Sequence, residues 1–180
     1  MRHYVDRRRF LTTSAGFLTL PVIAQLSGCT GNGESESEKE IFPDKKIELL
    51  DMALQHEFGA VVQYANHAGI IAALKRDPDG SIGAHIRKII CQEVDHAILL
   101  TDILKKNNVE PTVAVWPPQT AVTAGEMIKK DIDAEIGAIK LYQQILTLDF
   151  DDQVKTIIDN IIHSEEAHHH LFTEILHDIG

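Results

Sequence analysis

Apolar side chains recur at alternating steps of three and four residues in four stretches of the chain, and this spacing is the strongest constraint on its fold. The stretches cover residues 47–71, 82–103, 128–146 and 154–179. Residues at that spacing lie on one face of an α-helix, so each stretch predicts an amphipathic helix with one buried side. The chain is therefore predicted to be all-α, with four helices that pack their apolar faces together.

The connections between these helices predict their arrangement. Short polar loops join the first helix to the second and the third to the fourth, which predicts two antiparallel pairs. The middle connection, residues 108–120, contains Pro111, Pro117 and Pro118, and we expect Trp116 to hold it against the bundle. About 13 extended residues reach about 43 Å, and a helix of about 27 residues is about 40 Å long. The predicted fold over residues 44–180 is therefore a four-helix bundle whose two pairs are joined by a long crossover.

One glutamate interrupts each apolar stripe near its middle. In the second and fourth stripes a histidine follows the glutamate by three residues, on the same helix face. The residues are Glu57, Glu93 with His96, Glu135, and Glu165 with His168. Unpaired carboxylates in a core cost several kcal/mol each unless they are protonated or neutralised by cations. Two divalent metal ions would cancel four glutamate charges, so the pattern predicts a dinuclear metal site.

The two halves of the chain repeat this pattern. The motif E-x-x-A-x-x-x-Y occurs once in the first helix and once in the third, ending at Tyr64 and Tyr142. The motif E-x-x-H occurs once in the second helix and once in the fourth. A single copy of E-x-x-H is a weak signal, but two copies in this order, each with a partner glutamate, form a specific one.

Over residues 44–180 this arrangement resembles the ferritin-like superfamily of di-iron and di-manganese carboxylate proteins, particularly bacterioferritin and rubrerythrin. The resemblance implies terminal glutamate ligands, bridging glutamates and one histidine per metal. The terminal ligands would be Glu57 and Glu135, the bridging ligands Glu93 and Glu165, and the histidine ligands His96 and His168. It also implies that Tyr64 and Tyr142 hydrogen-bond to the ligands.

The expected function is a di-iron oxidoreductase, with manganese as an alternative metal. A carboxylate-rich site suits iron or manganese and the reduction of O2 or peroxide, as in a ferroxidase or a peroxidase. Haem is not expected, because Val94 stands where bacterioferritin has its haem-binding methionine. There are no rubredoxin-like cysteines, so the electron donor would be a separate molecule. Because the chain ends soon after His168, we expect a monomer or homodimer rather than a storage cage.

Two other functions stay open at this point. One is a metal-binding module that sequesters or delivers metal without turnover. The other is a structural or stress-linked envelope protein with a vestigial site. A manganese catalase shares the ligand pattern, whereas a quinone hydroxylase is disfavoured because no helix shows a membrane-embedding apolar face.

The N-terminus predicts export. Arg7, Arg8 and the following residues to Leu11 resemble a twin-arginine signal, and the sequence before Cys29 resembles a lipoprotein processing site. A membrane span is disfavoured, because the apolar stretch is short and broken by Pro21, whereas a span needs about 20 apolar residues. We therefore expect a signal over residues 1–28, lipid on Cys29, an acidic tether over residues 29–43, and a place at the outer side of the cytoplasmic membrane or in the periplasm.

The net charge and the cysteine content argue against nucleic-acid binding and against a disulfide bond. The net charge of −10 makes nucleic acid an unsuitable partner. With Cys29 carrying lipid, Cys91 is left without a disulfide partner.

The remaining histidines are given lesser roles. Glu166 and His169 share the E-x-x-H spacing, but their helix face is far more polar than that of Glu165 and His168. Together with His163, His170 and His177 they could bind a metal at the surface, although a solvated cluster is the favoured interpretation. His56, His67 and His85 are expected to be surface or satisfied polar groups.

Overall fold

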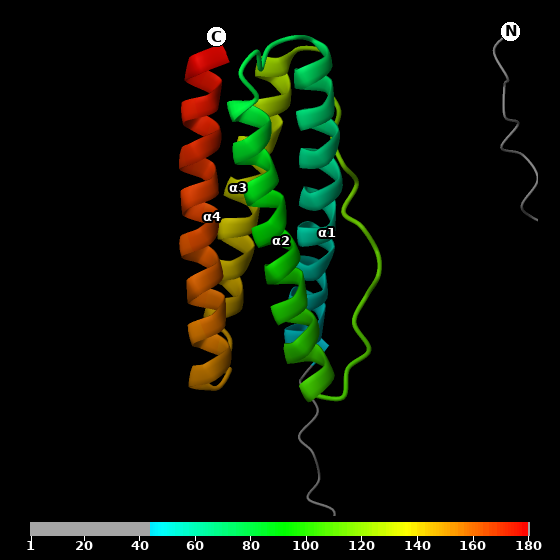
Figure 1. The fold of residues 1–180 in the computed structure, drawn as a ribbon. Helices are drawn as coiled ribbons and strands as arrows, with labels where there is room; N and C mark the ends of the chain where they lie inside the picture. Colours follow the sequence, from blue (N-terminus) through cyan, green and yellow to red (C-terminus); the bar gives the residue numbers. More distant parts are fainter. Residues whose placement is uncertain (1–43, 180) are drawn as a thin grey trace, which may run out of the picture. The chain divides into compact units, whose positions relative to one another are not determined.

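The computed structural model describes residues 44–179, and its regular structure is entirely helical. Figure 1 shows four long helices arranged as a bundle: α1 (Asp44–Ala73), α2 (Ser81–Lys106), α3 (Ala124–Leu146) and α4 (Asp152–Ile179). α1 packs most extensively on α2, and α3 on α4. The predicted all-α four-helix bundle is confirmed. The predicted export signal, the tether and Cys29 lie outside the described residues.

Side-chain hydrogen bonds stabilise the first turns of α2 and α3. At the start of α3, the Glu126 N–H donates to Thr123 Oγ1, and the Thr123 N–H donates back to Glu126 Oε2, both at 3.2 Å. This reciprocal pair is a capping box. Before α2, the Asp77 carboxylate accepts the N–H groups of Ile82 and Gly83 at 3.0 and 2.8 Å. These side chains satisfy helix N–H groups that have no partner within the helix.

The crossover, residues 107–123, runs alongside α1 (Figure 1). Three of its backbone N–H groups donate to residues of α1: Thr112 to Asp51 Oδ1 at 3.2 Å, Trp116 to the Gln55 carbonyl at 2.9 Å, and Gln119 to Gln63 Oε1 at 2.7 Å. Trp116 therefore attaches the loop to the bundle, as expected, but through its backbone. Its indole ring remains 45% exposed.

The core consists of two apolar clusters with polar residues between them. One cluster includes Leu100 and Ile158, and the other includes Ile86 and Phe172. In every helix, the glutamate that interrupts the stripe lies between residues of the first cluster and residues of the second. The bundle therefore places its buried acids halfway along its length.

The buried faces of α2 and α4 match the predicted stripes, whereas those of α1 and α3 depart from them at several positions. Val61 and Ile132, predicted to be buried, are only half-buried. Gln63, His67 and Asp131 are buried instead. These polar groups form hydrogen bonds with one another, described below, although Asp131 Oδ2 has no hydrogen-bond partner.

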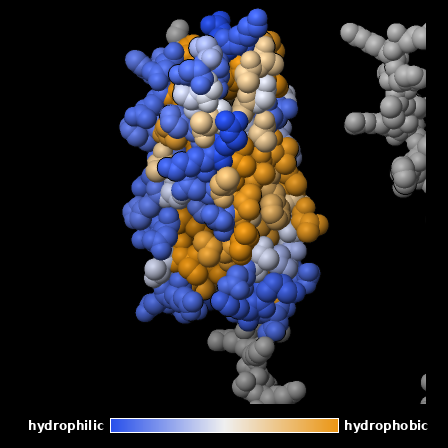
Figure 2. Space-filling view, in the orientation of Figure 1, coloured by the Kyte–Doolittle hydropathy of each residue, from blue (hydrophilic) through white to orange (hydrophobic). Residues whose placement is uncertain are grey.

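The outer surfaces of the two helix pairs differ. A shallow apolar groove lies on the side of α1 and α2, and Figure 2 shows hydrophobic residues over this part of the surface. The groove is lined by Phe58, Val61, Val94, Ala97, Ile98 and Thr101. The exposed positions of α4 instead carry histidines paired with acids. No helix within residues 44–179 combines the length and the apolar composition that a membrane span requires.

Candidate metal centre

The six predicted ligands converge in the middle of the bundle, and each side chain is buried. Their ligand atoms form two groups, and within each group these atoms lie within 4.8 Å of one another. The first group is Glu57, Glu93, His96 and Glu165, and the second is Glu93, Glu135, Glu165 and His168. Glu93 and Glu165 belong to both groups, which is the position of a carboxylate that bridges two ions. We call these six residues the carboxylate cluster.

Each shared glutamate turns one oxygen toward each histidine. His96 Nδ1 lies 3.2 Å from Glu93 Oε2 and 2.8 Å from Glu165 Oε1. His168 Nδ1 lies 3.0 Å from Glu93 Oε1 and 3.4 Å from Glu165 Oε2. The cluster is therefore nearly symmetric, as the repeat in the sequence suggests.

The outer glutamates complete the two ends of the cluster. Glu57 Oε2 lies 3.4 Å from His96 Nδ1, and Glu135 Oε2 lies 3.9 Å from His168 Nδ1. Each outer glutamate therefore belongs with one histidine, and the shared glutamates lie between them.

Two buried tyrosines hold the outer glutamates across the bundle. The Tyr64 hydroxyl on α1 donates to Glu135 on α3 at 2.7 Å, and the Tyr142 hydroxyl on α3 donates to Glu57 on α1. Burial, followed by the nearby carboxylates, raises the pKa of both tyrosines well above the usual range, so both hydroxyls keep their protons. Each half of the repeat thus orients a glutamate of the other half.

His168 has two additional partners that the sequence analysis missed. Its Nε2 lies 3.3 Å from Gln92 Oε1 and 3.4 Å from Ser164 Oγ. These contacts occupy Nε2 and leave Nδ1 to face the carboxylates. Their positions in the sequence could have indicated this role, because Gln92 directly precedes Glu93 and Ser164 directly precedes Glu165.

The outer glutamates favour their protonated forms when no metal is bound. Burial, followed by repulsion from Glu165 and Glu93, raises the pKa of Glu57 well above its usual value. Burial, a hydrogen bond with Glu165 and repulsion from Glu93 do the same for Glu135. Protons thus neutralise these two carboxyl groups.

The histidines favour their charged forms. Burial lowers the pKa of His96, but its hydrogen bonds to the carboxylates of Glu165, Glu57 and Glu93 outweigh burial and raise the value to about 12. Burial also lowers the pKa of His168. Its contacts with Glu165 and Glu93 outweigh burial and raise this pKa to about 9. Burial raises the pKa of Glu93 and Glu165, but hydrogen bonds from the two histidines outweigh it and lower both values.

The chemistry of the cluster fits metal ions. Four of its buried atoms lie within ion-pair distance of another ligand but have no partner with the geometry of a hydrogen bond: Glu57 Oε2, Glu93 Oε1, Glu165 Oε1 and His168 Nδ1. Buried polar atoms without partners are rare in native proteins, and each calls for an explanation such as an ion. All four are ligand atoms for divalent cations, and the excess of oxygen over nitrogen suits iron or manganese. The cluster is therefore able to hold metal.

A second buried polar cluster, which we call the Asp131 network, joins α1, α3 and the crossover. Asp131 Oδ1 lies 2.7 Å from His67 Nδ1 and accepts a hydrogen bond from Gln63 Nε2 at 2.9 Å. His67 Nε2 lies 3.0 Å from the Gln119 carbonyl. Both ring nitrogens thus face oxygen atoms. Burial raises the pKa of Asp131, while His67 and Gln63 act in the opposite direction.

The sequence analysis missed Asp131 and left the role of His67 undecided. Asp131 lies four residues before Glu135 and His67 three residues after Tyr64, so each shares a helix face with a residue already assigned to the core. That spacing was the available signal.

The other histidines and the remaining thiol lie outside the cluster. Glu166 is exposed and His169 is half-buried, in contrast to the buried Glu165 and His168. The Nε2 atom of His163 lies within ion-pair distance of Asp159, and its Nδ1 atom lies within ion-pair distance of Glu166. Within residues 44–179, three or more ligands that could share one ion occur only in the carboxylate cluster. Cys91 is exposed.

Comparison with known proteins agrees with this geometry. The family model of the ferritin-like domain matches residues 47–180, a range that contains all four helices except the first residues of α1. No curated protein matches the chain. Because the family model covers most of the chain and the fold is the expected four-helix bundle, the chain belongs to the family of ferritin-like domains.

Proposed function

We propose that the carboxylate cluster binds two iron ions and that the protein uses them to reduce O2 or peroxide, as a ferroxidase or a peroxidase does. The observation that carries this proposal is the pair of overlapping ligand groups that share Glu93 and Glu165. Two separate sites would not need shared carboxylates. Manganese is the alternative metal, because the same ligand types suit it.

Each residue of the carboxylate cluster would have the ligand role that its position indicates. Glu57 and His96 would hold one ion, Glu135 and His168 would hold the other, and the shared glutamates would bridge the two. The chemistry that such ions supply when bound is the transfer of electrons to O2 or peroxide.

The protein contributes orientation, charge and exclusion of water. Tyr64 and Tyr142 fix the outer glutamates, and Gln92 fixes His168, so the ligands need little rearrangement when metal arrives. Protons held on the Nδ1 atoms of His96 and His168 would leave on binding. The electron donor would be a separate molecule.

Anaerobic titration of the metal-free protein with Fe(II), followed by addition of O2 or peroxide, tests this function. We expect two Fe(II) ions per chain and then ferric absorption together with consumption of the oxidant. Two bound ions without any oxidation would instead indicate a metal-binding module without turnover. The variant that combines Glu93→Ala with Glu165→Ala serves as the control and should show neither binding nor oxidation.

We also propose that the protein acts at the cell envelope, anchored by lipid on Cys29. The support is the order of sequence signals, in which paired arginines precede an apolar stretch and a cysteine. Labelling with a radioactive fatty acid tests it: the native chain should carry label in the membrane fraction, and Cys29→Ala should not. Label on the Cys29→Ala variant would contradict the anchor.

A further inference from the structure

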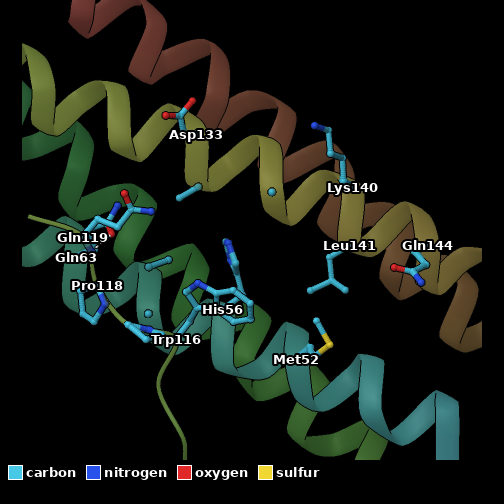
Figure 3. A pocket seen from close by; sticks show the side chains of 15 residues that line it. Met52, His56, Gln63, Trp116, Pro118, Gln119, Asp133, Lys140, Leu141 and Gln144 are labelled. Carbon is cyan, nitrogen blue, oxygen red and sulfur yellow. Dashed lines mark hydrogen bonds between the residues drawn. The ribbon is translucent and has the colours of Figure 1, made fainter.

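A cavity of about 370 Å³ lies between α1, α3 and the crossover, and the carboxylate cluster does not account for it. Figure 3 shows Met52 of α1 and Leu141 of α3 facing each other across it, with Gln63 and Gln119 together at its other end. Its volume is near the lower limit of the roughly 300–1,000 Å³ range of small-molecule sites. The cavity is therefore large enough for a compact organic molecule.

The cavity lies beside the metal centre on the side away from the ligand histidines. His56 and Ala134 line it, and they directly precede the outer glutamates Glu57 and Glu135. The two ligand histidines come from α2 and α4, neither of which lines the cavity. The cavity wall therefore includes the chain neighbours of both outer glutamates.

The outer wall of the cavity is held in place by close packing. A Cβ atom at Gly59 would lie 2.8 Å from the Trp116 carbonyl oxygen and 3.0 Å from Trp116 Cβ. Only glycine at this position lets the crossover approach α1 so closely. The backbone hydrogen bonds of Trp116 to Gln55 and of Gln119 to Gln63 fix the same segment. The cavity is thus formed before any ligand arrives, which lowers the cost of binding.

The walls combine an aromatic surface with a polar rim. The Trp116 indole is half-exposed although its backbone is anchored, and the His56 ring lies 6.3 Å from it, tilted by 48°. The exposed side chains of Asp133 and Lys140 also line the cavity, and neither forms an ion pair with another described residue. They offer a hydrogen-bond acceptor and a donor of opposite charge, which together favour a neutral ligand. Aromatic rings gain stabilisation from stacked or edge-on contact with other rings.

We propose that this cavity binds a neutral, planar aromatic molecule with a hydroxyl group, of the phenol or hydroquinone class. The ring contacts Trp116, Met52 and Leu141, and the hydroxyl hydrogen-bonds at the rim formed by Asp133 and Lys140. The site does not require metal, so it stands apart from the proposed function. If that function holds, a ligand here is placed beside the outer glutamates.

Phenol and cyclohexanol form a matched pair of probes, because they share size and hydroxyl group but only phenol is planar and aromatic. Trp116 is the only tryptophan of the chain, so its fluorescence reports on the cavity itself. We expect phenol to change this emission saturably in the metal-free full-length protein, and cyclohexanol to bind about tenfold more weakly. No saturable effect of phenol, or equal affinity for the two probes, would overturn the proposal.

Two glycine variants test the location. Gly59→Ala forces the crossover away from α1 and should abolish the phenol effect, whereas Gly69→Ala adds the same methyl group to the same helix where nothing lies within 4 Å and should bind phenol normally. Metal stoichiometry, measured on both variants, checks that the bundle is intact. Normal phenol binding by Gly59→Ala would contradict the location.

A third variant tests the aromatic wall without moving the backbone. Trp116→Leu keeps the N–H group that bonds to Gln55, and calorimetry should show phenol affinity reduced about fivefold. Unchanged affinity would contradict the assigned contact. Metal binding is measured separately in every case, so the failure of one proposal leaves the other standing.

Discussion

The bundle buries acids in two places, four residues apart on α3, and neutralises them in different ways. In the Asp131 network one carboxylate meets one histidine and one amide, so its hydrogen-bond partners come from the protein itself. In the carboxylate cluster four glutamates face only two histidines. Even with both histidines charged, the cluster lacks positive charge for two of its acids.

This difference explains which buried acids need something from outside the chain. The Asp131 network is a structural element that connects the crossover to α1 and α3. The carboxylate cluster is balanced either by protons on Glu57 and Glu135 or by metal ions that replace those protons. Buried acids therefore indicate a metal site where several of them converge and outnumber the histidines beside them.

The largest effect is expected from removing the shared glutamates. Combining Glu93→Ala with Glu165→Ala takes ligands from both groups at once, so metal affinity should fall by at least about a hundredfold. The helices should still form, because apolar packing stabilises them. Dialysis against Fe(II) or Mn(II) and circular dichroism measure the two properties. Asp131→Asn, which leaves every ligand in place, is the control and should keep its metal.

Breaking the Asp131 network should affect stability rather than metal binding. Asp131→Ala leaves His67 Nδ1 and Gln63 Nε2 buried without their partner, which costs about 1–3 kcal/mol of unfolding free energy. Asp133→Ala, an exposed position on the same helix, should change stability by no more than about 0.5 kcal/mol. Urea unfolding of both variants measures the difference. Equal stability of the two variants would mean that the network contributes nothing to folding.

Metal binding should weaken as the pH falls. The raised pKa values of Glu57, Glu135 and the two histidines mean that the metal-free cluster holds protons at neutral pH, and metal must displace them. Loss of at least one proton per ion lowers the affinity by at least about tenfold per pH unit. Calorimetry in buffers of different ionisation enthalpy counts the released protons. Binding without proton release would contradict this charge balance.

The raised pKa of His168 also predicts how the stability of the metal-free protein depends on pH. The pKa of His168 is raised from about 6.5 when unfolded to about 9 when folded. Its contribution to stability is therefore complete below about pH 6.5 and is lost as the pH rises toward about 9. Thermal unfolding of metal-free and metal-loaded protein across this range should show the loss only in the metal-free form.

The smallest effect is expected from the tyrosines. Tyr142→Phe removes the hydrogen bond to Glu57 without changing the packing, so metal affinity should fall about tenfold. Tyr64→Phe should have a similar effect through Glu135, because the arrangement is nearly symmetric. Gln143→Ala, at an exposed neighbouring position, is the control. Unchanged affinity in both tyrosine variants would show that these hydroxyls do not orient the ligands.

The helices differ in how much of them the sequence could predict. In α2 and α4 an apolar stripe with one glutamate and one histidine matches the buried face almost residue for residue. In α1 and α3 the rule that polar residues face solvent fails at Gln63, His67 and Asp131. His67 and Asp131 are 64 residues apart in the chain. The helical period places each residue on the core-facing side of its own helix, but it describes one helix at a time and does not show that the two residues pair.

The metal content of the native protein at equilibrium decides whether the carboxylate cluster is a dinuclear metal site. The metal-free chain is dialysed against Fe(II) without oxygen, or against Mn(II), and the bound ions per chain are counted beside the Glu93→Ala and Glu165→Ala double variant. Our account predicts two ions per native chain, with a higher melting temperature, and none in the double variant. Native protein that binds no metal, or a double variant that binds as many ions as the native chain, would contradict it.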